Sequence, residues 1–364
     1  MRLFLVIALL VFGALNFIAI FALLRLHPRR KAIVVALAVV CNLMWLFLPI
    51  LNARTDFSRL IRATLGPPWF AWLCFVLVYP LVALLSWLFK SAWPSRIFLR
   101  AAMITIPIGV WSALVPLDVE RVPVDFANAP NAKIAVLADL HTGLFTRPSR
   151  LRQIFATAAA LKPDVVLLAG DLIDDDPYFT TKLLDALRDF PPDIPLVAVL
   201  GNHENYGAPL EYIAKMRQSR VRLLVNEGAA VGPLWIAGIS DYAATLPQLR
   251  PNLGLALKGE RGFPIVLAHQ PKVFDEVIAR RLPLALVAHT HGGQFGFRSL
   301  HWSLAGLFLP YHMGLYRRGT SQMYVNTGTG YWLLPWRIGV VPEITLIELR
   351  SASPHSASTR NVAR

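Results

Sequence analysis

Two histidines separated by one residue, His289 and His291, follow the apolar run 284–287 and precede two glycines. A short apolar run between turn residues predicts a buried strand, and residues two apart in extended backbone point the same way. The two imidazoles can therefore face one point, and the glycines let the backbone pass close to whatever is bound there. On its own the pair is a weak indication, because histidines at strand ends are often ordinary hydrogen-bonded residues.

Four more polar groups follow apolar runs in the same way. They are Asp139 with His141, Asp171 with Asp174, Asn202 with His203 and Glu204, and His269. Carboxylates, an amide oxygen and neutral imidazoles suit divalent metal ions, so five such strand ends at one edge of a sheet would form a metal site. Each residue also has an ordinary explanation, because Asp and Asn after a strand are usually turn or cap residues.

The charge distribution along the 364 residues separates two regions. Residues 1–117 contain eleven Lys or Arg and a single acid, Asp56, whereas residues 118–350 are nearly balanced. A nucleic-acid-binding protein would carry its basic excess on the folded domain, so no nucleic acid partner is expected. Only Cys41 and Cys74 occur, both in apolar stretches, which excludes a disulfide framework and a thiolate metal site.

Four apolar segments, roughly 3–24, 32–51, 69–89 and 97–115, each approach the ~20 residues that a helix needs to cross a bilayer. The fourth is interrupted by Pro107. The loops 25–31 and 90–100 are basic, so the positive-inside rule places them in the cytoplasm. Four crossings would then put the rest of the chain on the outer face of the membrane.

The remaining chain alternates short apolar runs with helix-like stretches, including 150–161, 178–190 and 209–219, which predicts an α/β layered domain. The predicted organisation has four parts. They are a four-helix transmembrane anchor over 1–117, a linker over 118–131, the α/β domain over 132–350, and a disordered Ser-, Ala- and Arg-rich tail over 351–364.

The ordered motifs Asp-x-His, Gly-Asp-x-x-Asp, Gly-Asn-His-Glu, a lone His and His-x-His resemble the calcineurin-like metallophosphoesterase superfamily. The following Gly-Gly-Gln and the later Asn-Thr-Gly-Thr-Gly from Asn326 resemble its membrane-associated bacterial members. The resemblance implies a four-layer α/β/β/α sandwich, which here follows the α-helical transmembrane region. Together with the apolar segments and the basic loops, it predicts a multi-pass protein of the bacterial inner (cytoplasmic) membrane, with the catalytic domain on the periplasmic face. One departure is Ala288, where the family usually has Gly.

The resemblance also implies roles for the individual residues and two divalent metal ions, Mn, Fe or Zn. One metal ion would be held by Asp139, His141, Asp171 and His291. The other would be held by Asp171, Asn202, His269 and His289, with Asp171 bridging the two. His203 would protonate the leaving group and Asp174 would orient its imidazole. Asp175 and Asp176 are expected to be solvated, and His27, His301, His312 and His355 are expected to be non-ligands.

The implied activity is hydrolysis of a phosphodiester or pyrophosphate bond in a lipid-linked or nucleotide-linked substrate. A phosphomonoesterase of the same class is one alternative, and a membrane sensor that only binds a phosphorylated ligand is another. Residues 295–316 form an unusually apolar and aromatic connection. Such a segment either contacts lipid at the membrane interface or packs over the edge of a sheet, and the sequence leaves both possibilities open.

Overall fold

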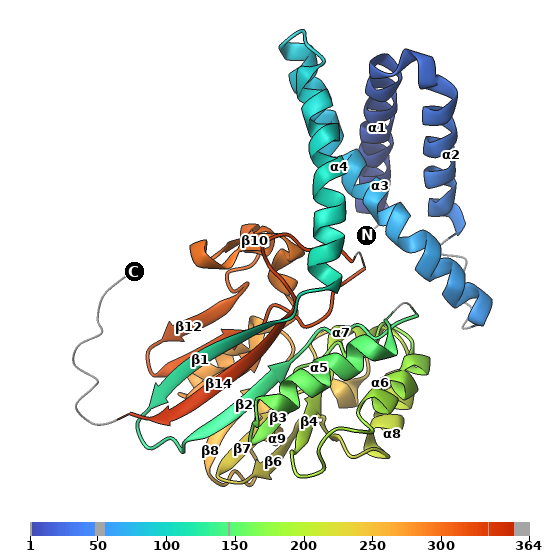
Figure 1. Cartoon of the computed structure of the whole chain (residues 1–364). Coiled ribbons are helices and arrows are strands. Elements are labelled where there is room, and N and C mark those ends of the chain that lie inside the picture. The colour runs from blue at the N-terminus through green and yellow to red at the C-terminus, as the bar shows by residue number, and fades with distance from the viewer. Residues whose placement is uncertain (1, 48–54, 145, 334, 353–364) are drawn as a thin grey trace. The chain divides into compact units, whose positions relative to one another are not determined.

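The computed structural model describes residues 2–47, 55–144, 146–333 and 335–352, which belong to two compact units, Met1–Val110 and Trp111–Arg364 (Figure 1). The division falls inside a helix, a few residues before the predicted boundary at 117. Residues 353–364, most of the predicted tail, lie outside the described residues.

The first unit is helical throughout its described residues, apart from short connections. Its helices are α1 (Arg2–Leu26), η1 (Pro28–Arg30), α2 (Lys31–Phe47), α3 (Asp56–Leu88) and α4 (Trp93–Leu114), the last of which runs on into the second unit. Helix α3 begins with a capping box between Thr55 and Ser58, which satisfies backbone N–H groups at its start. Ala19 of α1 packs with Val76 and Tyr79 of α3.

Nearly all described residues of the four predicted apolar segments lie in helices, and residues 48–51 of the second segment lie outside the described part of the chain. Pro107 lies inside α4 without ending it. By length and composition, α3 and α4 are each suited to crossing a membrane. The pair Val11–Leu26 and Pro28–Leu43, bent by 110°, meets the same criterion only when taken together. The described helices therefore provide two membrane-length spans, or three if the bent pair is one span.

The second unit is built on two six-stranded sheets. The first has the order β1 (Asp118–Phe126), β14 (Glu343–Ser351), β2 (Ala132–Leu137), β3 (Val165–Leu168), β4 (Leu196–Val199) and β5 (Arg222–Leu224). The second has the order β12 (Gly314–Arg318), β13 (Ser321–Val325), β9 (Leu284–Val287), β8 (Phe263–Leu267), β7 (Leu234–Gly238) and β6 (Glu227–Val231).

Alternating side chains bury both faces of each sheet. In β2, Ile134 and Val136 enter a core shared with the second sheet, whereas Ala135 and Leu137 face a helical layer. That layer contains α5 (Pro148–Ala160), α6 (Thr180–Ala186) and α8 (Pro209–Arg217). A third core joins the outer face of the second sheet to α9 (Leu253–Ala256) and α10 (Phe274–Ala279). The predicted α/β/β/α sandwich is confirmed.

Most of the region predicted as a linker, 118–131, forms a strand in the structure. Residues Asp118–Phe126 form β1, which pairs in parallel with β14 along its whole length at the edge of the first sheet. The predicted final strand also extends to Ser351 rather than ending at Leu349. Both changes enlarge the sheet around β2, the strand that leads into the first predicted ligands.

Strands β2, β3, β4 and β5 run parallel, and so do β7, β8, β9 and β13. Within each sheet the carboxyl ends of the parallel strands therefore meet at one edge. Ligands of open α/β sheets bind outside the carboxyl ends of their strands. The polar residues singled out in the sequence follow these ends.

Candidate metal centre

All seven predicted metal ligands lie together at the carboxyl ends of β2, β3, β4, β8 and β9. Three groups of buried or half-buried donors each offer atoms within 4.8 Å of one another. They are Asp139, His141 and His291; His141, Asp171 and His203; and Asp171, His269 and His289. Asn202 joins them through its Oδ1, which lies 3.1 Å from His269 Nε2. The turn and cap explanations for Asp139, Asp171 and Asn202 therefore do not account for where their side chains lie.

The first predicted ligand set faces inward across short distances. His141 Nε2 lies 3.1 Å from His291 Nε2 and 3.8 Å from Asp171 Oδ2. Asp139 Oδ1 lies 3.5 Å from His291 Nε2, is buried, and has no hydrogen-bond partner among the described residues. A buried carboxylate oxygen without a donor is costly, so this arrangement is explained by a cation that the oxygen would bind.

The second set gathers around His269. Its Nε2 lies 3.1 Å from Asp171 Oδ2 and 3.3 Å from His289 Nδ1, while its Nδ1 lies 2.7 Å from the carbonyl oxygen of Ala169. That carbonyl fixes the proton on Nδ1 and leaves the Nε2 lone pair directed into the cluster. Asp171 is within reach of both sets, as a bridging carboxylate must be.

The backbone around the cluster is strained at the ligands themselves. The φ angles of Asp139, His141, Asp171, His289 and His291 are all positive, between 43° and 76°. Such conformations of non-glycine residues cost on the order of 1–3 kcal/mol each and concentrate at functional sites. At Gly170, with φ of 86°, a β-carbon would come within 2.8 Å of His269 Nδ1, so glycine is required there.

The electrostatics keep two of the imidazoles neutral. Burial, reinforced by the positive potential of His269, lowers the pKa of His289 to about 4. Burial also depresses the pKa of His291, with His141 and Arg337 adding to the effect. Burial alone would raise the pKa of Asp171, but His269 and His141 hold it below its usual value. For His289, His291 and Asp171 these are the protonation states that metal ligation needs. His269 differs: burial would lower its pKa, but the carboxylates of Asp171 and Asp139 raise it well above its usual value, so metal binding there would release a proton.

Of the two predicted catalytic residues, His203 lies where it was expected and Asp174 does not contact it. His203 does lie beside the cluster, with its ring 4.6 Å from that of His141 in an edge-to-face arrangement. Its partner, however, is Asp175, whose Oδ1 lies 2.7 Å from His203 Nδ1. Asp174 instead approaches His141, with Oδ1 3.3 Å from Nδ1. Asp175, which is exposed as expected, therefore lies against His203 in place of Asp174.

Asp175 changes the acidity of its partner. Burial would lower the pKa of His203, but the contact with Asp175 and the charge of Asp171 outweigh it and raise the pKa to about 9. The neighbouring Asp176 has a local role, because it accepts a hydrogen bond from the backbone N–H of Tyr178. The His203 backbone N–H also donates to Asp171 Oδ1 at 2.9 Å, which ties the imidazole to the cluster.

Glu204, the last residue of the Gly-Asn-His-Glu motif, organises the turns that carry the ligands. Its buried carboxylate accepts hydrogen bonds from the backbone N–H groups of Gly201 at 2.6 Å, Leu172 at 2.7 Å, Asp171 at 3.0 Å and Ile173 at 3.2 Å. One side chain thereby joins the end of β3 to the end of β4. Glu204 is therefore a buried residue that holds the two ligand-bearing turns together.

A fully buried arginine lies behind the cluster and was not predicted. Arg337 Nη1 donates to the carbonyl of Thr327 at 2.9 Å, and its Nη2 lies 3.2 Å from His291 Nδ1. Burial lowers the pKa of Arg337 to about 10, so the guanidinium stays charged. The only sequence signal was a lone basic residue within an apolar stretch.

The histidines outside the motifs take no part in the metal-ligand groups found among the described residues. His312 Nδ1 lies 3.0 Å from the Ser303 hydroxyl, and His301 Nε2 lies 3.2 Å from the Tyr316 hydroxyl. His27 lies in the turn before η1. His355 lies outside the described residues.

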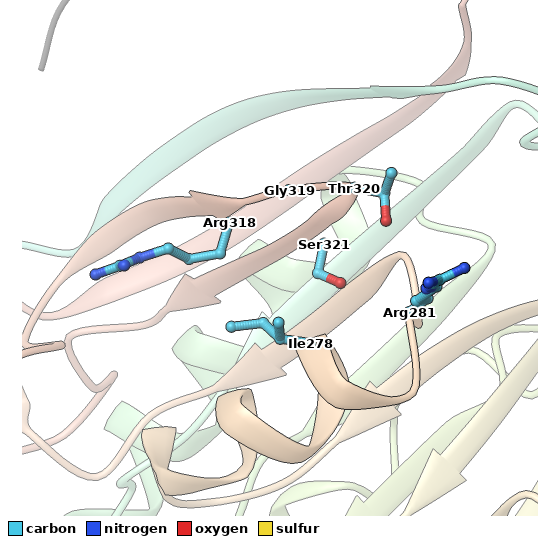
Figure 2. A pocket seen from close by; sticks show the side chains of 6 residues that line it. All are labelled: Ile278, Arg281, Arg318, Gly319, Thr320 and Ser321. Atoms are coloured by element: carbon cyan, nitrogen blue, oxygen red, sulfur yellow. The ribbon is translucent and has the colours of Figure 1, made fainter.

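An open hollow of about 490 Å³ lies elsewhere on the second unit, lined by the end of α10 and the β12–β13 turn. Figure 2 shows that its two basic side chains, Arg281 and Arg318, point away from each other, so they do not form an anion site. The hollow adjoins the amino ends of β9 and β13, whereas the metal ligands follow the carboxyl ends. It is therefore separate from the candidate metal centre.

Comparison with known proteins agrees with this geometry. Residues 132–293 match the model of the calcineurin-like phosphoesterase family. A metallophosphoesterase of Campylobacter jejuni is 30% identical over 66% of this chain and 65% of its own length. A transmembrane protein with a metallophosphoesterase domain from Danio rerio is 32% identical over 65% of this chain and 57% of its own.

A metallophosphoesterase of Helicobacter pylori is also 32% identical, over 60% of this chain and 59% of its own length. The chain thus spans less than two thirds of each of these three relatives. The similarity concerns the unit that holds the clustered Asp, Asn and His side chains.

Proposed function

We propose that the chain is a calcineurin-like phosphoesterase, the family whose model matches residues 132–293, and that it acts as a membrane-associated, metal-dependent phosphoester hydrolase. One observation carries the proposal. Two buried carboxylates, one amide oxygen and four imidazoles converge at a single sheet edge, with several of their nitrogen and oxygen atoms 3.1–3.5 Å apart. A divalent cation among such atoms would accept their lone pairs and offset their mutual repulsion.

The donor set fits two divalent ions. Asp139, His141, Asp171 and His291 would hold one, and Asp171, Asn202, His269 and His289 would hold the other, with Asp171 shared. Oxygen and imidazole donors without thiolates suit Mn, Fe or Zn. When bound, such a pair supplies Lewis acidity for the attack of water on phosphorus and offsets the charge on the phosphoryl oxygens.

The chain itself supplies the proton for the leaving group. The raised pKa of His203, about 9, keeps its imidazole protonated near neutral pH. Asp175 occupies the Nδ1 side of the ring, so Nε2 is the atom that would donate to the leaving oxygen. Asp175 is thus a positioning residue and His203 the general acid.

Substrate preference is the finer part of the proposal. We favour a phosphodiester or pyrophosphate, lipid-linked or nucleotide-linked, over a phosphomonoester. The test is hydrolysis of bis-p-nitrophenyl phosphate against p-nitrophenyl phosphate by the full chain with manganese. Faster turnover of the diester supports the preference, and the reverse makes the protein a phosphomonoesterase.

The catalytic proposal has its own control. Asp171→Asn should abolish turnover and reduce bound metal measured by elemental analysis, because it removes the shared carboxylate. Asp193→Asn, at an exposed position, should change neither. Absence of turnover with manganese, iron and zinc alike would instead favour a sensor that binds a phosphorylated ligand without cleaving it.

For the helical region we propose a multi-pass anchor in a bacterial inner membrane with the catalytic unit on the periplasmic face. The four crossings are α1, α2, α3 and α4, so α1 and α2 would each cross separately rather than as one bent span. The basic loops 25–31 and 90–100 support this through the positive-inside rule. The measurement is the activity of alkaline phosphatase fused to the C-terminus. An inactive fusion, with a cytoplasmic reporter active at the same position, would reverse the orientation.

A further inference from the structure

A stretch of the second unit exposes an apolar surface next to the metal centre. It comprises β10 (Gly296–Phe297), η6 (Arg298–Leu300), β11 (Trp302–Ser303) and η7 (Leu304–Leu307), together with Phe308 and Trp332. Leu300 is 72% exposed, Leu307 61% and Phe308 81%. Figure 1 shows the region around β10 beyond the edge of the two sheets.

The backbone of this segment packs on the turn after β9, whereas its largest apolar side chains stay exposed. Below them, stacked and edge-to-face aromatic rings form a base. The Phe295 ring centroid lies 5.8 Å from that of Trp302 and 6.2 Å from that of Trp336, and the Phe297 and Trp302 rings are stacked at 6.1 Å. Phe297, Leu300, Leu307 and Phe308 remain exposed above this base. The aromatic base holds the surface in place without burying it.

The surface is built onto the turn that carries His291. At Gly293, with φ of 62°, a β-carbon would lie 2.4 Å from the backbone nitrogen of Ala305, so η5 (His291–Gln294) and η7 are in direct backbone contact. The Thr290 hydroxyl donates to the carbonyl of His312 at 2.7 Å. Gln294 exchanges two hydrogen bonds with the backbone of Trp332, at 2.8 and 3.2 Å. The apolar side chains therefore border the metal centre.

The charge of the surrounding chain points to a specific occupant. Residues 277–342 contain no Asp or Glu, so no acidic side chain of this stretch opposes contact with anionic headgroups. Exposed aromatic and aliphatic side chains suit the interface of a bilayer, where apolar groups enter the acyl region. The same chain also carries α3 and α4, which are long and apolar enough to cross a membrane.

We propose that Phe297, Leu300, Trp302, Leu307 and Phe308 form a bilayer-contact surface that brings the metal-ligand edge of the domain to the lipid headgroups. Such a surface would give the site access to a phosphoester held in the membrane. The contact itself does not depend on catalysis, because the same side chains would enter lipid whether or not metal is bound.

The test is the immersion depth of a nitroxide in the full chain, reconstituted in nanodiscs of phosphatidylcholine and phosphatidylglycerol. A background with Cys41→Ala and Cys74→Ala carries either Leu307→Cys or the matched control Leu255→Cys. Leu255 is also an exposed leucine of the second unit, at 54%, and lies in α9 away from the surface. Collisions with oxygen, which concentrates in lipid, are compared with collisions with a water-soluble nickel chelate.

We expect the label at position 307 to favour oxygen over the nickel chelate and the label at 255 to favour the chelate. Equal, water-like accessibility at both positions would overturn the proposal. Shielding of position 307 from both reagents would also overturn it, because that result means a protein contact. Hydrolysis of bis-p-nitrophenyl phosphate by the same variants reports separately on catalysis, so the lipid contact and the enzymatic function can fail independently.

Discussion

Two adjacent aspartates give the sharpest test of the catalytic proposal. Asp175 lies against His203, whereas Asp174 lies against the predicted ligand His141. Replacing either by Asn removes one negative charge from the same turn and leaves its size almost unchanged. Asp175→Asn should alter the protonation of His203, and Asp174→Asn should alter the binding of metal by His141.

The size of the first effect follows from the pKa of His203, about 9 with Asp175 in place against an ordinary value of 6.5. At pH 8 about 90% of the imidazole is then protonated, and about 3% would be at the ordinary value. Because the charge of Asp171 also raises this pKa, Asp175→Asn lowers the rate at pH 8 by at most about 30-fold. Because only the protonated form donates, the alkaline limb of the rate profile should move from near pH 9 toward 6.5.

The second effect concerns metal affinity. Loss of a carboxylate that supports a metal-bound histidine typically weakens affinity about 10–100-fold. Asp174→Asn should therefore need more manganese for half-maximal rate but keep the wild-type alkaline limb once metal is saturating. The assay is turnover against pH and manganese, for bis-p-nitrophenyl phosphate and for diphenyl phosphate. Because phenol is the poorer leaving group, Asp175→Asn should slow the phenyl ester more.

The opposite assignment gives the opposite pattern. If Asp174→Asn moves the alkaline limb of the pH–rate profile to lower pH while Asp175→Asn leaves it in place, then Asp174 orients His203. The contact between Asp175 and His203 would then be irrelevant to catalysis. Equal effects of both variants on both substrates would mean that neither aspartate acts through proton donation.

Two buried carboxylates, Glu204 and Glu343, give three further predictions about stability. Glu204→Gln places an NH₂ group among four backbone N–H donors and should lower the free energy of unfolding in urea by about 1–3 kcal/mol, with exposed Glu260→Gln unchanged. Arg298 donates to fully buried Glu343 at 2.6 Å, so Arg298→Ala should cost about 3–5 kcal/mol and exposed Arg317→Ala little. Burial opposes ionisation of Glu343, but Arg298 and neighbouring hydroxyls hold the pKa of Glu343 below its usual value. The stability that the ionised Glu343 provides is present above the usual pKa of Glu and is lost as the pH falls through the depressed pKa. Arg298→Ala should therefore move acid unfolding to higher pH.

The strand ends were predictable because two simple signals agree. Each apolar run of four or five residues is long enough for a buried strand, and each is followed by a ligand-type side chain. Parallel strands place such residues at one edge, so sequence order alone was sufficient to group Asp139, Asp171, Asn202, His269 and His289.

The partners of individual side chains were not predictable, because backbone geometry decides them. The backbone N–H of Asp174 donates to the carbonyl of Thr142 at 3.2 Å, and this contact holds Asp174 beside the His141 turn. Asp175, one residue further, meets His203 instead. In the sequence these are consecutive acids in a polar turn, with nothing to distinguish them.

Strand β1 was missed for a related reason. Its charged residues and Pro123 resemble a linker, and Pro is unfavourable in the middle of a sheet because it lacks an N–H. In the fold β1 is an edge strand, where the missing donor is tolerated, and its buried Val122 and Val124 complete the inter-sheet core. Whether a strand lies at an edge depends on the assembled sheet and cannot be read from the strand itself.

The position of Arg337 links the charge of the site to its proposed reaction. Two divalent ions would bring four positive charges to the carboxylates of Asp139 and Asp171, and the imidazoles and Asn202 would add none. Arg337, behind His291, contributes a further fixed positive charge from a fully buried position, where charges interact more strongly than at the surface. A centre with this surplus attracts an anionic phosphoester and stabilises the charge that grows on its oxygens during attack, whereas a third carboxylate at the same place would reduce both effects.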